Sequence, residues 1–423
     1  MIESWVPVRP ESDFPIQNLP LGVFSAGGKP PRIGVAIGQM LLDCGALARA
    51  GFFDDCCDRE LLEAPRLNPL LTAGRDTWRL LRERLTQLLR EGGDPRVRDA
   101  GAEHFLIPQA SVTMRVPMEI GDYVDFYSSL EHATNLGRLF RPNAEPLLPN
   151  WRWLPVGYHG RSGTIVVDGT PIRRPCGQRK PPDAPAPDFG PSRRLDIELE
   201  MGFVTGPGNA LGTPIGIDDA GEHIFGLLLV NDWSARDIQA WEYQPLGPFL
   251  GKSFATTISP WIVTLDALEP FRVDGPRQEP PPLPYLRAGE AWAYDVHLSV
   301  ALQTARMRER GAASHQISQT TFREMYWNVA QQLAHATVNG AVARPGDLFA
   351  SGTISGSAPG TQGSLIELTW NGARAIELPD GEKRAFLEDG DEITLRAWCE
   401  KPGARRIGFG AARGIITPAA VSS

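Results

Sequence analysis

The chain has 423 residues, of which 42% are hydrophobic and 22% charged, and its formal net charge is −8. This composition is typical of a globular protein, and the length predicts two or three domains. The acidic balance argues against a nucleic-acid partner. Because neither an apolar run of membrane-spanning length nor a leader-like N-terminus stands out, we also expect no membrane partner and a cytoplasmic location.

Apolar periodicity predicts two amphipathic helices. The first carries apolar residues at helical spacing from Trp78 to Leu89 and ends before Gly92, and the second runs from Phe322 to Leu333 behind a Thr321–Glu324 capping box. Elsewhere, short apolar runs bounded by Gly, Pro, Asp or Asn predict strands. These runs cover residues 105–109, 163–172, 198–206, 224–232, 260–268, 294–302, 364–370 and 391–398.

The pattern therefore predicts a mostly β protein with some α-helix, in two domains. A boundary near residues 116–120 separates a small β-plus-helix module, residues 1–117, from a larger part, residues 118–423. All the candidate catalytic residues follow the boundary. We expect the larger part to hold the active site.

Three carboxylates alternate with apolar residues in the run LDIELEM. If this run is a strand, Asp196, Glu198 and Glu200 project from one face and repel one another. A hard cation with oxygen ligands, Ca²⁺ or Mg²⁺, would relieve that repulsion, since no Cys or His lies in the run to suggest zinc. The alternative is a half-exposed strand with an acidic, solvated face.

Asp232 ends a long apolar strand, where binding residues often project into a cleft. It could also simply cap a turn. Arg236 and Gln239 follow four and seven residues later, so a helix beginning after Asp232 would align all three on one face and suit an anion. Two exposed residues on a surface helix are the alternative.

A candidate general base lies in the run YVDFYSSLEHATN. A possible Ser128–Glu131 capping box would place His132 in the first turns of a helix, and histidine suits proton transfer at neutral pH. A hydrogen-bonded structural histidine is the alternative. Glu367 interrupts the apolar strand predicted at 364–370, where a buried acid would need a partner and could orient a histidine. An exposed strand position would explain it equally well.

Taken together, five runs resemble the fumarylacetoacetase family, in order and over nearly the whole chain. They are residues 122–135, 148–161, 195–209, 231–254 and 344–357. The resemblance implies a small SH3-like N-terminal barrel, a larger mixed β-sandwich or roll, and a homodimer. It also implies hydrolysis of the carbon–carbon bond of 4-fumarylacetoacetate, the last step of tyrosine and phenylalanine catabolism.

The resemblance further implies a role for individual residues, carried over by motif. It implies a divalent cation, Ca²⁺ or Mg²⁺, held by Asp125, Glu198, Glu200 and Asp232, but not by Asp196. It makes His132 the base, oriented by Glu367, and assigns charge stabilisation to Arg236, Gln239 and Lys252. Substrate contacts fall on Tyr127, Arg141, Tyr158, Gln239, Tyr243 and Thr353.

A second cation position is suggested near Asp232, Lys252 and Thr256. Ala255 stands where glycine is expected in the family, and its methyl group puts that second position in doubt. Two alternatives to the main reading stay open. One is a related acylpyruvate hydrolase, decarboxylase or hydratase on the same fold, and the other is a non-catalytic β protein stabilised by calcium.

Overall fold

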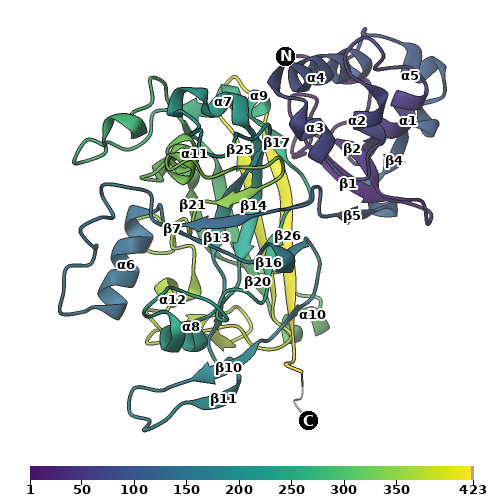
Figure 1. The fold of residues 1–423 in the computed structure, drawn as a ribbon. Coiled ribbons are helices and arrows are strands. Elements are labelled where there is room, and N and C mark those ends of the chain that lie inside the picture. Colours follow the sequence, from purple (N-terminus) through teal and green to yellow (C-terminus); the bar gives the residue numbers. More distant parts are fainter. Residues whose placement is uncertain (421–423) are drawn as a thin grey trace.

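A computed structural model of the chain describes residues 1–420 (Figure 1). The N-terminal part is built on a five-stranded antiparallel sheet with the order β4-β3-β2-β1-β5. Its strands are β1 (Leu21–Ser25), β2 (Arg32–Ile37), β3 (Met40–Asp43), β4 (Leu106–Pro108) and β5 (Thr113–Arg115). Its helices are α1 (Cys44–Arg49), α2 (Arg59–Glu63), α3 (Asn68–Thr72), α4 (Arg75–Leu89) and α5 (Arg96–Asp99).

Helix α4 confirms the first predicted helix. The apolar residues that gave it its periodicity are all buried, including Trp78, Leu81 and Leu85. They join a core cluster that also contains Val204, Phe225 and other residues of the larger part. The N-terminal part therefore packs directly against the larger part of the molecule, as Figure 1 shows beside strand β17 (Val263–Thr264).

An eight-stranded mixed sheet forms the centre of the larger part. Its order is β7-β6-β22-β13-β14-β16-β8, with β17 also pairing with β14. The strands are β6 (Tyr123–Phe126), β7 (Gly157–His159), β8 (Ile165–Val167), β13 (Leu199–Thr205), β14 (Ile224–Asp232), β16 (Thr256–Ile258) and β22 (Leu348–Ala350). All nine residues of β14 are buried, as expected for a central strand covered on both faces.

A second sheet, ordered β21-β20-β25-β26-β9, faces the first. Its strands are β9 (Ile172–Arg173), β20 (His297–Gln303), β21 (His315–Thr321), β25 (Glu392–Cys399) and β26 (Ile407–Thr417). In Figure 1 the long yellow strands β25 and β26 run beside β14, and one apolar cluster joins Leu227 and Leu229 of β14 to Leu395 of β25 and Phe409 of β26. This arrangement confirms the predicted mostly β fold.

Shorter elements complete the larger part. The two-stranded pairs are β10 (Cys176–Arg179) with β11 (Asp188–Pro191), β12 (Leu195–Asp196) with β15 (Ser234–Ala235), β18 (Arg272–Val273) with β19 (Ala293–Tyr294), and β23 (Ile376–Glu377) with β24 (Lys383–Arg384). The helices are α6 (Leu130–Phe140), α7 (Ala220–His223), α8 (Arg236–Glu242), α9 (Leu265–Leu268), α10 (Ala305–Glu309), α11 (Val329–Thr337) and α12 (Leu365–Leu368). Among the described residues, no helix is long and apolar enough to cross a membrane.

Several sequence predictions about individual elements were wrong. Residues 365–368 form helix α12 instead of a strand, and residues 265–268 form helix α9 at the end of another predicted strand. The second predicted helix is divided into a 3₁₀ turn at Phe322–Glu324 and helix α11, whose capping box is Asn328–Gln331. Finally, the run LDIELEM is not one continuous strand, since Ile197 and Glu198 separate β12 from β13.

Candidate active site

The register of the eight-stranded sheet explains why distant carboxylates meet. Asp125 on β6 pairs with Ala350 on β22, which in turn pairs with Gly202 on β13. Glu200 lies two residues from Gly202 and therefore on the same face of the sheet. On the next strand Asp232 lies two residues beyond Val230, the partner of Glu200, so it too lies on that face. Strand pairing alone therefore gathers Asp125, Glu200 and Asp232 on one face of the sheet.

Glu198 joins these acids from the interruption between β12 and β13. The backbone N–H of Asp232 donates to the carbonyl oxygen of Glu198, which holds the two residues side by side. Carboxylate oxygens of Asp125, Glu198 and Asp232 all lie within 4.8 Å of one another, a spacing that could hold a metal ion. Glu200 does not belong to this compact group, although the same sheet face carries it.

Two of the four acids lack the hydrogen bonds that buried carboxylates normally have. Both carboxylate oxygens of Glu200, and Oδ1 of Asp125, are buried with no hydrogen-bond partner. Burial, followed by the charge of Asp232, raises the pKa of Asp125 well above its ordinary value. Burial, followed by the charge of Asp125, does the same to the pKa of Glu200. Unpaired oxygens on buried acids fit an oxygen-ligated divalent cation, which would supply the missing positive charge.

Lys252 is the cationic side chain nearest to the other two acids. Its Nζ donates to Glu198 Oε2 at 2.5 Å and to Asp232 Oδ2 at 2.7 Å. Burial alone would raise the pKa of Glu198, but Lys252 and Arg236 more than offset it and hold that pKa below its ordinary value. The charge of this half of the cluster is therefore partly neutralised by protein groups.

The residues of the suggested second cation position contact one another directly. Thr256 Oγ1 donates to Asp232 Oδ1 at 2.8 Å, while Lys252 donates to the other oxygen. Ala255, where glycine was expected, is buried. The ammonium group of Lys252 thus provides one positive charge at this place, and a second cation here stays a prediction.

His132 and Glu367 form a direct pair. His132 is the third residue of helix α6, and its Nδ1 lies 2.6 Å from Glu367 Oε2, with both side chains almost fully buried. The helix is capped by Ser129, whose Oγ accepts from the N–H of His132, so the predicted Ser128–Glu131 box was one residue out of register. Ser128 instead accepts a hydrogen bond from Gln332. With Nδ1 engaged, Nε2 is the ring nitrogen left for a reactant.

Glu367 receives hydrogen bonds at both carboxylate oxygens. Oε2 accepts from Ser355 at 2.9 Å and Ser364 at 2.6 Å, and Oε1 accepts from Asn135 at 2.9 Å. Although burial opposes ionisation, His132 and these donors hold the pKa of Glu367 below its ordinary value. We did not identify the three donors from the sequence. Only Asn135 could have been predicted, because it lies three residues after His132 and therefore on the same face of the helix.

Arg236 begins helix α8, and its first turn brings Gln239 beside it. Arg236 Nη1 lies 3.1 Å from Gln239 Oε1 and 2.8 Å from a carboxylate oxygen of Glu198. The predicted helix beginning directly after Asp232 was wrong, because β15 intervenes before Arg236. Even so, Asp232, Arg236 and Gln239 lie in one connected group. Lys252 donates to both Asp232 and Glu198, and Arg236 contacts both Glu198 and Gln239. Arg236 Nη2 is buried without a partner and is free to meet an anion.

Of three further predicted substrate contacts, Tyr158 and Tyr127 touch a candidate ligand and the histidine, and Thr353 is buried. Tyr158 on β7 donates to Asp232 Oδ2 at 3.2 Å. The ring of Tyr127 packs edge-on against the imidazole of His132, with 5.3 Å between centroids. Thr353 is buried, and its Oγ1 has no partner. Gly352 precedes it with φ +80°, and an added Cβ would lie 2.2 Å from the carbonyl oxygen of Phe126, so glycine is required in this turn.

Arg141 and Tyr243 lie at the ends of two helices, α6 and α8. The ring of Tyr243 lies 6.3 Å from that of Phe140, so the two helix ends are neighbours. Arg141 Nη2 donates to the carbonyl oxygen of Pro146, while its Nε is buried and unpaired. Both residues are only partly buried, which suits the outer wall of a substrate site.

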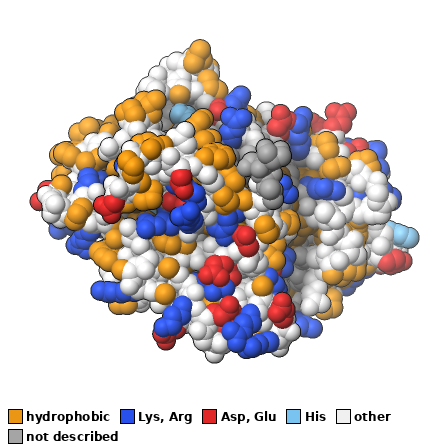
Figure 2. Space-filling model, turned by 90° about the horizontal axis from the view of Figure 1, so that it is seen from below, with side chains coloured by type: hydrophobic (Ala, Val, Ile, Leu, Met, Phe, Trp, Pro, Cys, Tyr) orange, Lys and Arg blue, Asp and Glu red, His pale blue; other side chains and the backbone are white. Residues whose placement is uncertain are grey.

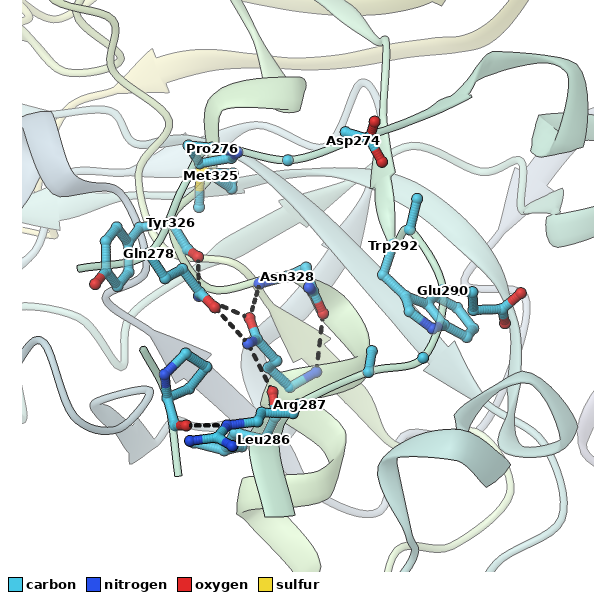
Figure 3. A pocket seen from close by; sticks show the side chains of 16 residues that line it. Asp274, Pro276, Gln278, Leu286, Arg287, Glu290, Trp292, Met325, Tyr326 and Asn328 are labelled. Atoms are coloured by element: carbon cyan, nitrogen blue, oxygen red, sulfur yellow. Dashed lines mark hydrogen bonds between the residues drawn. The ribbon is translucent and has the colours of Figure 1, made fainter. Parts of the chain in front are cut away.

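Other surface features offer less chemistry. A pocket of about 450 Å³ lies between the loop around Asp274 to Trp292 and the start of α11, and none of the candidate catalytic, cation-binding or substrate-binding residues lines it (Figure 3). Its polar side chains largely satisfy one another, as Gln278 and Asn328 do with Gln331. On the face seen in Figure 2, basic and acidic side chains are intermingled, without a surface of one sign.

Comparison with known proteins agrees with this geometry along the whole chain. Residues 17–117 match the family described as "Fumarylacetoacetase N-terminal", and residues 123–416 match "Fumarylacetoacetate (FAA) hydrolase C-terminal". Fumarylacetoacetase of Rattus norvegicus is 51% identical over 421 residues, covering 98% of this chain and 99% of the relative. Fumarylacetoacetase of Homo sapiens is 51% identical over 425 residues, covering 99% and 100%.

A solved structure supports the fold alone. The fumarylacetoacetate hydrolase from psychrophilic Exiguobacterium antarcticum covers 95% of this chain and 99% of its own, with a TM-score of 0.52 and 16% identity. The fold and the site define an enzyme of the hydrolase class whose buried acids could hold a divalent cation. Within that class, the chain belongs to the fumarylacetoacetase family.

Proposed function

We propose that the chain hydrolyses the carbon–carbon bond of 4-fumarylacetoacetate to fumarate and acetoacetate, the last step of tyrosine and phenylalanine breakdown. The observation that carries the proposal is the identity of about half of all residues to fumarylacetoacetases over nearly their entire length. The site supports it independently, since it combines a hydrogen-bonded histidine, unpaired cationic donors and buried acids.

The proposed cation is Ca²⁺ or Mg²⁺, held by Asp125, Glu198, Glu200 and Asp232. The unpaired oxygens of Asp125 and Glu200 support this ligand set, because hard cations prefer carboxylate oxygen. When bound, such a cation polarises the diketone and stabilises negative charge on its oxygens. The second position, near Asp232, Lys252 and Thr256, is proposed as structural only.

His132 is proposed as the general base, with Glu367 as the group that orients it. Because Nδ1 faces Glu367, Nε2 can take the proton from an attacking water molecule. The water oxygen then bonds to the ketone carbon beside the fumaroyl double bond. The bond from that carbon to the acetoacetyl CH₂ group breaks, and its electron pair leaves as an enolate that is protonated to acetoacetate. Base catalysis of this kind typically contributes 10²–10⁴-fold.

Arg236, Gln239 and Lys252 are proposed to meet the negative charge that develops during the reaction. The free Nη2 of Arg236 is the best-supported donor, because the rest of that guanidinium is already fixed in place. Donors held in advance need no reorganisation when charge appears, and each is worth about 10²–10³-fold.

The remaining predicted residues would bind the substrate. We propose that Arg141 pairs with a substrate carboxylate, as a guanidinium suits this anion. Thr353 offers its unpaired hydroxyl group, and Tyr127, Tyr158 and Tyr243 form the walls. Each of these side chains belongs to a different segment, so the site requires the folded larger part of the chain.

We further propose that the enzyme is a cytoplasmic homodimer, as the family resemblance implies. Gel filtration with light scattering would measure the mass directly. A single species at the monomer mass of about 46.2 kDa at micromolar concentration would contradict the dimer.

The decisive assay follows purified, cation-loaded protein with 4-fumarylacetoacetate by ¹H NMR. We expect fumarate and acetoacetate to form in equal amounts. Rapid turnover of acylpyruvates without turnover of fumarylacetoacetate would instead support a related hydrolase. A protein that cleaves neither, yet is stabilised by calcium, would support the non-catalytic alternative.

A further inference from the structure

Asp196 is the member of the LDIELEM acids that has no place in the cation cluster. It is completely buried at the end of β12, and four N–H donors converge on it. Arg236 Nε donates to Oδ2 at 2.8 Å, and the backbone N–H of Ile366 donates to the same oxygen at 3.0 Å. Oδ1 accepts from the backbone N–H groups of Leu365 and Ile197, both at 2.7 Å.

Three of these four bonds join two separate parts of the proposed catalytic site. One partner, Arg236, carries the buried, unpaired Nη2 that we propose as an anion donor. The other partners, Leu365 and Ile366, are the first two residues of helix α12, and the next residue is Glu367. A single carboxylate thus fixes the base of the guanidinium and the backbone that carries the acid oriented toward His132.

We propose that Asp196 is a positioning residue that sets the distance between the anion-stabilising Arg236 and the His132–Glu367 pair. The inference rests on the proposed function, because it assigns both groups to one hydrolytic step. In that step Arg236 meets the oxyanion while His132 removes the proton, so the two must hold one fixed spacing. A shift of either group would slow the reaction without removing any group that touches the substrate.

Asparagine is a sharp test because it preserves shape but not acceptor capacity. Its single side-chain oxygen can replace only one carboxylate oxygen, so its NH₂ group must face N–H donors of Arg236 or of α12. One of these donor groups must move away. The cation ligands keep all their formal charge, so cation affinity should change little.

The chain offers a matched control for loss of a buried ion pair. Asp391 is also completely buried and binds Arg384 through Nε at 2.9 Å and Nη2 at 3.1 Å. It additionally accepts from the backbone N–H of Glu388. Asp391→Asn therefore removes a similar network that contacts none of the proposed cation ligands, and it should cost stability in a similar way.

The experiment compares the full-length, cation-loaded wild type with Asp196→Asn and Asp391→Asn. It measures kcat and KM for fumarylacetoacetate, the Kd for Ca²⁺, the melting temperature, and the ¹⁵N-histidine spectrum. We expect Asp196→Asn to lower kcat about 10- to 100-fold, as a displaced donor would. Its Kd for Ca²⁺ should stay within about threefold of the wild type. The resonance of the His132 Nδ1 proton should shift, whereas Asp391→Asn should change only the melting temperature.

Asp196→Glu keeps the measurement informative if the asparagine variant does not fold. It retains the charge that Arg236 needs, but its extra methylene displaces the guanidinium relative to α12, so kcat should again fall while Ca²⁺ still binds. Equal kcat values for the wild type and the folded Asp196 variants, with an unchanged His132 resonance, would overturn the inference alone. A wild type that does not cleave fumarylacetoacetate would overturn the proposed function and this inference with it.

Discussion

Two groups of buried acids lie close together in this site, and they differ in how completely the protein satisfies them. Glu367 accepts hydrogen bonds from His132, Asn135, Ser355 and Ser364, and its pKa is lowered. Glu200 accepts none at either oxygen, and its pKa is raised well above the ordinary value. Both side chains are nearly inaccessible to solvent.

Glu367 is therefore fully hydrogen-bonded within the protein. The acid cluster of Asp125, Glu198, Glu200 and Asp232 is not, because it keeps unpaired carboxylate oxygens. The contact with Glu367 holds the imidazole of His132 in one orientation before any reactant arrives, and such preorganisation favours catalysis. The acids around Glu200 carry more negative charge than the protein neutralises, so they need an added cation or protons. Variants of Glu367 and variants of the cation-binding acids should therefore fail in different ways.

The largest expected effect is a loss of turnover when the proposed base, His132, is removed. His132→Ala should lower kcat by roughly 10²-fold or more, since it removes the proposed acceptor of the water's proton. Cation affinity and KM should remain close to the wild type, because the acids and Arg141 are untouched. Stopped-flow turnover and calorimetric cation titration on one preparation would measure both.

A histidine with only a structural role would behave differently. The His132→Ala protein would then melt at a lower temperature, while its turnover per folded molecule stayed near normal. That outcome would remove the histidine from the mechanism.

A smaller loss is expected when the orienting acid loses its charge. Glu367→Gln should reduce kcat less than His132→Ala does, because the imidazole remains in place but is less well held. The double variant should be scarcely slower than His132→Ala alone, since residues that work as one unit are strongly non-additive. Losses that multiply in the double variant would show that the two residues act in separate steps.

Removing a charge from the acid cluster should weaken cation binding first. Asp232→Asn or Glu198→Gln should raise the Kd for Ca²⁺ and Mg²⁺ by about tenfold or more, with activity lost in parallel unless the cation is in excess. Asp347→Asn is the matched control, because Asp347 is a buried acid just before β22, at the opposite end of that strand from the site. Equal loss of cation affinity in the control would contradict the ligand set.

The smallest effect should be a pH-dependent gain in stability on adding the cation. Asp125 and Glu200 have raised pKa values in the folded protein, so that state binds protons more tightly than the unfolded chain above the ordinary values of 3.8 and 4.5. The cation-free protein should therefore lose stability as pH rises from about 5 to 7.5, and bound cation should remove that loss. Glu198 and Glu367 have lowered pKa values, so their contribution is lost only in more acid solution.

Melting curves with chelator and with excess Ca²⁺ would measure this gap at each pH. The gap should widen by a few degrees toward neutral pH, and Glu200→Gln should reduce the widening by removing one of the two groups. A gap that is constant with pH, or that narrows, would contradict the raised pKa values.

The sequence predicted the strands better than the connections between them. Long strands such as β14 were predicted because a strand buried on both faces has consecutive apolar residues. Glu367 was placed on a strand, because four residues are too few to separate one helical turn from a strand by periodicity. The neighbouring Asp196, Glu198 and Glu200 were read as one continuous face, although a break at Ile197 and Glu198 gives Asp196 different partners.

The composition of the site was predictable only in part. The predicted residues meet because of sheet register, which pairs Asp125 with Ala350, more than 200 residues away in sequence, and places Glu200 and Asp232 on neighbouring strands. Local patterns contain no such information. Ser355 and Ser364 were missed because nothing in their own segments distinguishes them from turn residues. Their importance depends on a carboxylate that reaches them only in the folded chain.

The most direct test of the whole account is a titration of chelator-treated enzyme with Ca²⁺ or Mg²⁺, following cation occupancy and fumarylacetoacetate turnover in the same samples. The account predicts negligible turnover without the cation, and activity that rises in proportion to occupancy until the catalytic site of each chain is filled. Full turnover by protein shown to be free of divalent cation, or complete occupancy without turnover, would contradict it.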